Sequence, residues 1–315
     1  MAGRQRLDLE LVSRGLVASR QQAQQLIRAG RVRSGTTVLD KPGVPVAPGQ
    51  ELAVEQPPRF VSRGGEKLLA ALDALPISVE GRICLDGGIS TGGFSDCLLQ
   101  HGAARIYGID VGYGQTAWSL RSDARLVLRE RTNLRHLSPA DLYGPADPWP
   151  DLAVADVSFI SLSRVLPALH GLLLPGAEAV LLVKPQFEVG RGRVGKGGVV
   201  RDPQAHADAL EAVIAAAAAL DWRMAAALAS PITGPAGNHE YLVWIRPHDA
   251  EPMALNGARD TENEPISATA SIAATPPLVV ETSRSALEWL VARTLAPKGR
   301  AQSMGQPLGG EGANG

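Results

Sequence analysis

Residues 82–94, with the sequence Arg-Ile-Cys-Leu-Asp-Gly-Gly-Ile-Ser-Thr-Gly-Gly-Phe, constrain the fold more than any other stretch of the chain. The apolar residues 83–85 predict the end of a buried parallel strand, and Asp86 then opens a glycine-rich turn. Phe94 and the apolar residues after it have the spacing of a helix face. Only a backbone without side chains can turn this sharply and let a ligand reach its N–H groups. The stretch therefore predicts a strand, a nucleotide-binding turn and a helix.

The alternation of strand and helix patterns continues to about residue 247 and predicts an α/β fold. Such alternation is typical of a mostly parallel, Rossmann-like sheet with helices on both faces, in which ligands bind beyond the carboxyl ends of the strands. The residues at those ends are Asp86, Asp110, Asp156 and Lys184. We expect strands near 82–86, 105–110, 125–128, 151–156 and 177–183, helices near 93–102, 115–121, 161–171 and 203–220, and two late strands near 223–230 and 239–246.

The second strand end helps to identify the ligand. Asp110 lies 24 residues after Asp86, where an acid hydrogen-bonds the ribose of an adenosine-containing ligand, and this leaves NAD and S-adenosylmethionine both open. Dinucleotide sites use Gly-x-Gly-x-x-Gly, a spacing that this turn lacks. Asp86 would also repel a pyrophosphate, whereas it suits the cationic sulfonium and the amino group of S-adenosylmethionine. The pattern favours S-adenosylmethionine.

The first 35 residues have a charge pattern of their own. They contain seven arginines against two acids, although the whole chain has a net charge of −1. Residues 6–30 predict two short helices, separated by Gly15 and with Ser19 as the N-cap of the second, and short strands follow up to residue 54. The module resembles the αL RNA-binding domain of small-subunit ribosomal protein four; the alternative is a solvated arginine face. The resemblance implies RNA contacts by Arg4, Arg6, Arg20, Arg28, Arg31 and Arg33.

Composition divides the chain further. We expect the αL domain at 4–56, a proline-containing linker at 57–61, the α/β domain at 62–247 and a largely disordered tail at 248–315. An amphipathic helix over 62–75 opens the α/β domain, and a short helix over 283–295 interrupts the tail.

Several motifs in this order resemble the TlyA family, which joins an αL domain to an FtsJ-like methyltransferase domain. They are Leu-Asp-Gly-Gly-Ile-Ser-Thr-Gly-Gly-Phe, Gly-Ile-Asp-Val-Gly-Tyr-Gly-Gln, Glu-Arg-Thr-Asn, Ala-Asp-Val-Ser-Phe-Ile-Ser and Val-Lys-Pro-Gln-Phe-Glu, within a match over residues 4–247. Gly87 and Ile89 depart from the usual family residues. The resemblance implies a class I methyltransferase sheet, S-adenosylmethionine as cofactor, and methylation of a cytidine ribose in ribosomal RNA. The cofactor contacts expected are Asp86, Gly87, Gly88, Ser90, Thr91, Gly92, Gly93, Phe94, Asp110, Asn133 and Asp156.

FtsJ-like enzymes use a Lys-Asp-Lys-Glu tetrad, and the matching positions are Lys67, Asp156, Lys184 and Glu240. A ribose hydroxyl is a poor nucleophile, so the enzyme must align it with the methyl group and remove its proton. The resemblance makes Lys184 the residue that engages the 2′-oxygen, either as a base or by orienting the hydroxyl. Taken singly, the same residues also fit a solvated lysine at 67, a capping acid at 156 and an exposed strand acid at 240.

A glycine-rich basic loop follows Lys184, over residues 187–203. We interpret it as a lid that grips RNA phosphates, the alternative being a flexible surface loop. The RNA contacts expected in the α/β domain are Arg63, Arg191, Arg193, Lys196 and Arg201.

Other functional classes have little support in the sequence. No Cys-x-x-Cys pair or histidine cluster predicts a metal, and Cys84 and Cys97 read as buried, unpaired thiols. No apolar run has membrane-spanning length and no leader is visible, so we expect a cytoplasmic protein. We infer no obligate protein partner. Two alternatives remain: a non-catalytic RNA-binding assembly factor, and a pore-forming haemolysin, which would need a membrane segment.

Overall fold

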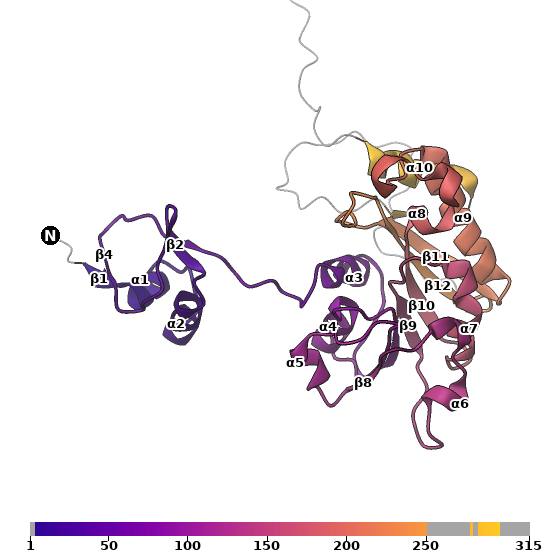
Figure 1. Cartoon of the computed structure of the whole chain (residues 1–315), viewed down its shortest axis with the longest axis horizontal. Coiled ribbons are helices and arrows are strands. Elements are labelled where there is room, and N and C mark those ends of the chain that lie inside the picture. Colours follow the sequence, from indigo (N-terminus) through magenta and orange to yellow (C-terminus); the bar gives the residue numbers. More distant parts are fainter. Residues whose placement is uncertain (1–3, 251–277, 280–282, 297–315) are drawn as a thin grey trace, which may run out of the picture. The chain divides into compact units, whose positions relative to one another are not determined.

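The computed structural model describes residues 4–250, 278–279 and 283–296. Most of the tail at 248–315, predicted to be largely disordered, lies outside the described residues. The chain divides between Arg59 and Phe60 into an N-terminal and a C-terminal unit, which are described separately (Figure 1).

The N-terminal unit contains the two predicted helices and several short strands. Ser19 caps the second helix, its hydroxyl accepting a hydrogen bond from the Gln22 N–H at 3.2 Å, as predicted. Leu7, Leu11 and Ile27 are fully buried between the helices and the strands. The elements are β1 (Gln5–Arg6), α1 (Leu7–Ser13), α2 (Arg20–Arg28), β2 (Val32–Ser34), β3 (Thr37–Val38), β4 (Pro45–Val46) and β5 (Ala53–Val54).

The C-terminal unit is built on an eight-stranded sheet in the order β13-β11-β12-β10-β9-β6-β7-β8. The five strands from β10 to β8 are parallel, β12 runs antiparallel to β10, and β11 pairs antiparallel with β12. The predicted Rossmann-like sheet is therefore confirmed. Its strands are β6 (Ile83–Gly87), β7 (Arg105–Ile109), β8 (Leu126–Arg129), β9 (Leu152–Ala155), β10 (Glu178–Val183), β11 (Trp222–Ala229), β12 (Tyr241–Pro247) and β13 (Leu278–Val279).

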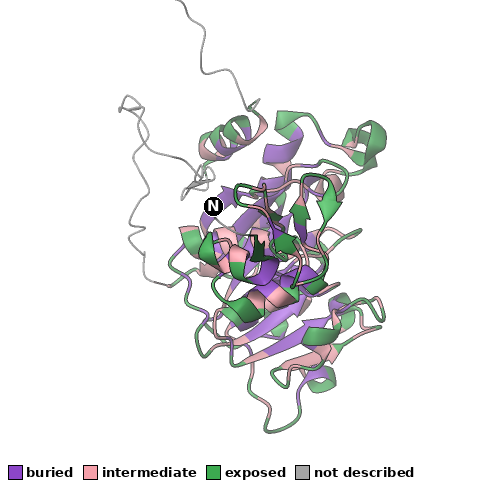
Figure 2. Cartoon of the chain, turned by 90° about the vertical axis from the view of Figure 1, so that its left-hand side faces the viewer, coloured by how far each residue is buried: buried purple, intermediate pink, exposed green. Residues whose placement is uncertain are grey.

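Helices cover both faces of this sheet, with α3 and α4 on one side and α7, α9 and α10 on the other (Figure 1). Alternate strand residues pack into the two resulting cores, and Figure 2 shows the central strands as buried. The helices are α3 (Gly64–Ala74), α4 (Gly93–Gln100), α5 (Trp118–Arg121), α6 (Pro139–Leu142), α7 (Leu166–Gly171), α8 (Pro185–Glu188), α9 (Pro203–Ala218) and α10 (Arg284–Leu295), with 3₁₀ turns at Leu134–His136, Leu162–Arg164, Arg191–Arg193 and Lys196–Gly198.

Two predicted helices are shorter than expected. Only Trp118–Arg121 of the predicted 115–121 is helical, because the residues before it bind the glycine turn: the Thr116 hydroxyl donates to Ser90 O at 3.0 Å and Ala117 N–H to Thr91 O at 3.0 Å. The predicted helix 161–171 is divided into a 3₁₀ turn and α7.

The helix predicted in the tail is confirmed as α10, and it packs against α9. Leu287, Leu290 and Val291 are buried in the core on that side of the sheet. Arg284 forms ion pairs with Asp208 at 2.7 Å and Glu211 at 2.5 Å, both on α9. The pattern of residues in the tail did not predict this docking.

Candidate active site

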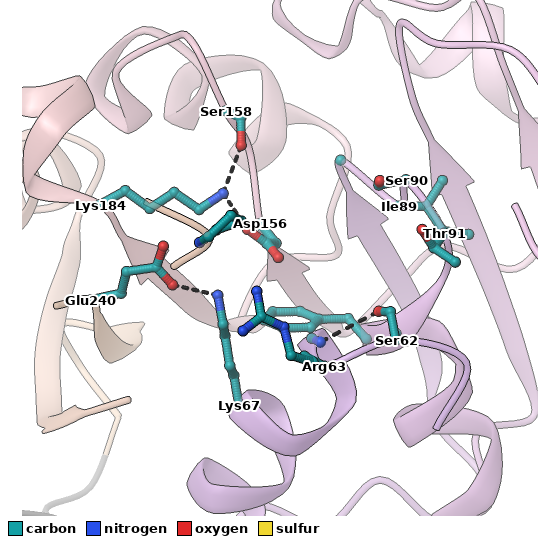
Figure 3. Close-up of a pocket in the computed structure, with 15 residues that line it drawn as sticks. Ser62, Arg63, Lys67, Ile89, Ser90, Thr91, Asp156, Ser158, Lys184 and Glu240 are labelled. Carbon is teal, nitrogen blue, oxygen red and sulfur yellow. Dashed lines mark hydrogen bonds and ion pairs between the residues drawn. The ribbon is translucent and has the colours of Figure 1, made fainter. Parts of the chain in front are cut away.

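Four charged side chains meet at the carboxyl edge of the sheet. Asp156 follows β9 and Lys184 follows β10, at the ends of neighbouring parallel strands. Glu240 directly precedes β12, and because β12 runs antiparallel it begins at the edge where β9 and β10 end. Lys67 reaches the same edge from α3 (Figure 3). The structure thus brings together the whole tetrad predicted from the family resemblance.

The four residues form two ion pairs. Lys67 Nζ binds the carboxylate of Glu240, 173 residues away in the sequence. Lys184 Nζ lies 2.6 Å from Asp156 Oδ1 and donates to the Ser158 hydroxyl at 2.7 Å. Lys67, Lys184 and Glu240 are 7%, 8% and 1% exposed. A solvated lysine at 67 and an exposed strand acid at 240 are therefore wrong.

Both pairs line a cavity of about 250 Å³ that also reaches the glycine turn (Figure 3). Of the predicted cofactor contacts, Gly88, Ser90, Thr91, Gly93, Phe94 and Asp156 line it, and Arg63 from the predicted RNA contacts does so too. Sequence reasoning missed the remaining lining residues. They are Ser62, Gly64, Ile89, Ser158 and Pro235. Ser158 could have been found, since it lies two residues after Asp156 in a motif already singled out.

Two glycines of the turn allow backbones to approach closely. Gly88 has φ +88°, and a Cβ there would lie 2.8 Å from the carbonyl oxygen of Asp156. A Cβ at Gly93 would lie 2.2 Å from Ser62 Oγ and 2.8 Å from the backbone nitrogen of Gly65. Gly93 is the first residue of α4, whose N-terminus has no side-chain cap. The turn therefore packs directly against the end of β9 and the start of α3, and these close contacts set the shape of the cavity wall.

Replacing Gly88 with alanine is expected to weaken binding of S-adenosylmethionine by at least about 30-fold, because the new methyl group displaces the backbone of the neighbouring strand end. The matched control is Gly176→Ala, where φ is +85° but no atom lies within 4 Å of the added Cβ. Calorimetric titration of both variants checks this. Equal affinities in the two variants would show that backbone strain alone, and not the close approach, matters.

The other predicted cofactor contacts lie outside the cavity lining. The Asp110 carboxylate accepts hydrogen bonds from Ser90 N–H at 2.8 Å and Gly112 N–H at 2.6 Å, and so fixes the turn. Asn133 accepts from Arg135 N–H at 3.1 Å and caps the 3₁₀ turn that follows. Gly87 and Gly92 are buried within the turn.

Asp86 is fully buried beneath the turn. Its Oδ2 accepts a hydrogen bond from the Ser95 hydroxyl at 2.7 Å, while Oδ1 has no hydrogen-bond partner among the described residues. Burial raises the pKa of this carboxyl to about 7, and the bond from Ser95 offsets part of the effect. A carboxyl that holds its proton at near-neutral pH can donate a hydrogen bond through its O–H, whereas an ionised carboxylate can only accept.

This raised pKa predicts how stability depends on pH. The Asp86 carboxyl has a pKa of about 7 in the folded state, against an ordinary value of 3.8. The stability that the folded state gains by binding this proton is therefore fully present below pH 4 and is lost as the pH rises through 7. The side-chain amide introduced by Asp86→Asn does not titrate. The variant's free energy of unfolding, relative to the original chain, is expected to rise by about 2–4 kcal/mol between pH 4 and 8. Denaturant titrations without cofactor check this; a constant difference would contradict it.

The predicted RNA-binding arginines divide into paired and unpaired groups. In the N-terminal unit, Arg6 and Arg20 each lie 3.0 Å from the buried carboxylate of Asp8, and Arg31 lies 3.5 Å from Glu55. The bond from Arg6 is the main cause that holds the pKa of Asp8 well below its usual range. The other predicted RNA-binding arginines of this unit are exposed and have no side-chain partner among the described residues. They are Arg4, Arg28 and Arg33.

The basic loop shows the same division. Arg193 pairs with Asp202 at 3.0 Å and Asp208 at 2.5 Å. Arg191, Lys196 and Arg201 are exposed. These three side chains are the loop cations available to a ligand.

Neither a metal centre nor a membrane span is found among the described residues. No group of three or more His, Cys, Asp or Glu side chains there is arranged to hold a metal ion. In the same part of the chain, no helix combines the length and apolar character needed to cross a membrane.

Comparison with known proteins places this geometry in a family. The sequence profile of FtsJ-like methyltransferases matches residues 60–247, and that of the S4 domain matches residues 5–52. The 16S/23S rRNA (cytidine-2′-O)-methyltransferase TlyA of Mycobacterium tuberculosis is 50% identical over 269 residues, which cover 85% of this chain and 99% of that protein. The chain belongs to the TlyA family of FtsJ-like methyltransferases.

Other TlyA-like proteins carry different names. Hemolysin A of Brachyspira hyodysenteriae is 39% identical over 75% of this chain and 98% of its own. A solved structure from Streptococcus thermophilus, described provisionally as a hemolysin, is 40% identical with a TM-score of 0.59, over 79% of this chain and 90% of that one. The TlyA resemblance inferred from the motifs is confirmed, and with it the combination of an S4-type module and a methyltransferase domain.

Proposed function

We propose that this protein transfers the methyl group of S-adenosylmethionine to the 2′-hydroxyl of a cytidine in ribosomal RNA. The observation that carries the proposal is the pair of buried lysine–carboxylate contacts, which share one cavity with the glycine turn. Transfer to a hydroxyl needs a polar group that orients the oxygen and one that removes its proton, next to a site for the methyl donor.

The turn fits S-adenosylmethionine. Gly88 and Gly93 let the turn lie directly against the backbone after β9 and at the start of α3, and Asp110 accepts the Ser90 N–H, so that the turn is held rigid beside the cavity. Asp156 adds a carboxylate on the cavity side, which suits a cationic ligand. When bound there, the cofactor supplies an electrophilic methyl group.

Lys184 is placed to act on the acceptor hydroxyl. Its ammonium has three N–H donors; it donates one to the Ser158 hydroxyl and is held by charge beside Asp156, which leaves a donor available to the 2′-oxygen. As the O–CH₃ bond forms and the bond from the methyl group to sulfur breaks, the hydroxyl proton passes to the Asp156 carboxylate, either directly or by relay through Lys184, which gives one ammonium proton to Asp156 as it takes up the hydroxyl proton. Asp156 is 24% exposed and can release that proton to solvent. Lys67 and Glu240, paired across the cavity, hold α3 against the start of β12 and shape the opposite wall.

The direct test is transfer of label from methyl-labelled S-adenosylmethionine to unmodified ribosomal RNA and to isolated ribosomal subunits, with the purified protein. We expect label in the RNA and place the reaction in the cytoplasm, where the subunits are assembled. RNA binding without label transfer would support a non-catalytic assembly factor instead.

The S4-type module is expected to bind that RNA through its unpaired arginines. Arg28→Ala combined with Arg33→Ala should weaken RNA binding several-fold and make its salt dependence shallower, by about 0.7–0.9 in log–log slope per lost phosphate contact. The melting temperature should not change, because both side chains are exposed. Arg20→Ala is the comparison variant: it removes one of the two arginines paired with the buried Asp8 and should lower the melting temperature. An unchanged salt slope in the double variant contradicts the assignment.

A further inference from the structure

Residues 190–201 are the part of the basic loop that carries its exposed cations, and besides the ion pairs of Arg193 this part is held by buried contacts around Val200. Val200 is 2% exposed. Its N–H donates to Asn238 Oδ1 at 2.9 Å, and its carbonyl accepts from His206 Nε2 at 3.0 Å. Asn238 also donates through Nδ2 to the carbonyl of Gly198 at 2.8 Å. Asn238 and His206 are 2% and 0% exposed, so these bonds are shielded from water.

The segment that makes these contacts also carries part of the candidate active site. Asn238 binds the loop, and Glu240 binds Lys67. The hydroxyl oxygen of Tyr241 lies 3.0 Å from His206 Nδ1. At its other end the loop follows α8, which begins directly after Lys184. Both ends of the loop are thus tied to elements that carry members of the tetrad.

The loop's conformation depends on such anchors. Gly190, Gly197 and Gly198 have φ between +73° and +77° with no atom within 4 Å of an added Cβ, so packing does not hold these positions. Residues 191–198 form only two 3₁₀ turns and bury no residue. Such a segment would lose conformational entropy on binding unless it is ordered beforehand.

We propose that Asn238 and His206 are positioning residues, which hold the basic loop so that Arg191, Lys196 and Arg201 meet RNA phosphates. The inference rests on the proposed function only in taking RNA as the ligand. Neither residue contacts the RNA. They lower the cost of binding by fixing the backbone that carries the three cations.

The test is equilibrium binding of the full chain to unmodified ribosomal RNA at several salt concentrations. Asn238→Ala is expected to weaken binding about tenfold and to make the salt dependence shallower, because displaced cations release fewer counterions. In a chain that already carries Arg191→Ala, Lys196→Ala and Arg201→Ala, the same substitution should have no further effect. His206→Gln, whose amide nitrogen can still donate to Val200, should bind like the original chain, whereas His206→Ala should bind weakly.

A control separates positioning from general destabilisation. Tyr143→Phe removes another buried hydrogen bond, from the Tyr143 hydroxyl to the carbonyl of Leu172 at 2.6 Å. It should lower the melting temperature without changing the salt slope. The proposal is overturned if Asn238→Ala leaves the slope unchanged, or if its effect is equally large in the chain without the three loop cations. If the original chain binds RNA but transfers no methyl group, the proposed function is overturned. The salt dependence of RNA binding would still show whether Asn238 and His206 position the loop.

Discussion

Lys184→Ala is expected to reduce methyl transfer at saturating S-adenosylmethionine and RNA by at least about 10³-fold, because it removes both the donor that orients the 2′-oxygen and the partner that takes up its proton. Binding of the cofactor and of RNA should change by less than about threefold, since their main contacts lie elsewhere. Single-turnover kinetics with separately measured dissociation constants checks both expectations. Unchanged transfer would refute the role given to Lys184.

Lys184→Arg sharpens this test. A guanidinium can keep the ion pair with Asp156 and a hydrogen bond to the oxygen, but it does not give up its proton in proteins. If Lys184 only orients the hydroxyl, the arginine variant should retain a substantial part of the activity. If it accepts the proton, the variant should be as inactive as Lys184→Ala.

Glu240→Ala is expected to destabilise the fold by about 3–5 kcal/mol, because it leaves the Lys67 ammonium buried without its counter-ion. Methyl transfer should be lost as well. Denaturant unfolding measures the first effect, and label transfer at a temperature well below the variant's melting point measures the second.

A double variant separates these two effects. Lys67→Met together with Glu240→Leu replaces the buried pair by apolar side chains of similar size, which often restores stability. We expect unfolding free energy close to that of the original chain and no recovery of methyl transfer. Recovered activity would show that the pair is a structural contact only.

Local patterns in the sequence predicted most of the C-terminal unit. The residues at strand ends, Asp86, Asp156 and Lys184, follow from strand–helix alternation, because a parallel sheet brings its carboxyl ends to one edge. What alternation could not predict is which side chains face the cavity at that edge. Asp86 is turned into the core toward Ser95, and Asp110 toward the backbone of the turn, since each satisfies nearby donors there.

Long-range partners were beyond the reach of pattern reasoning. The pairing of Lys67 with Glu240 depends on where the antiparallel strand β12 inserts in the sheet, and no local period encodes that position. Only the family resemblance placed the two residues in one site. The docking of α10 on α9 is a similar case, because an amphipathic helix shows that one face is buried but not against what.

The central claim concerns the atom that receives the methyl group. The most direct measurement is to incubate unmodified ribosomal RNA with the purified protein and S-adenosylmethionine, and then to map 2′-O-methylated nucleotides by their resistance to alkaline cleavage. The account predicts that one cytidine becomes resistant to alkaline cleavage. This new resistance should not appear when the Lys184→Ala variant is used. RNA with no new resistant position, or with the methyl group on a base, would contradict it.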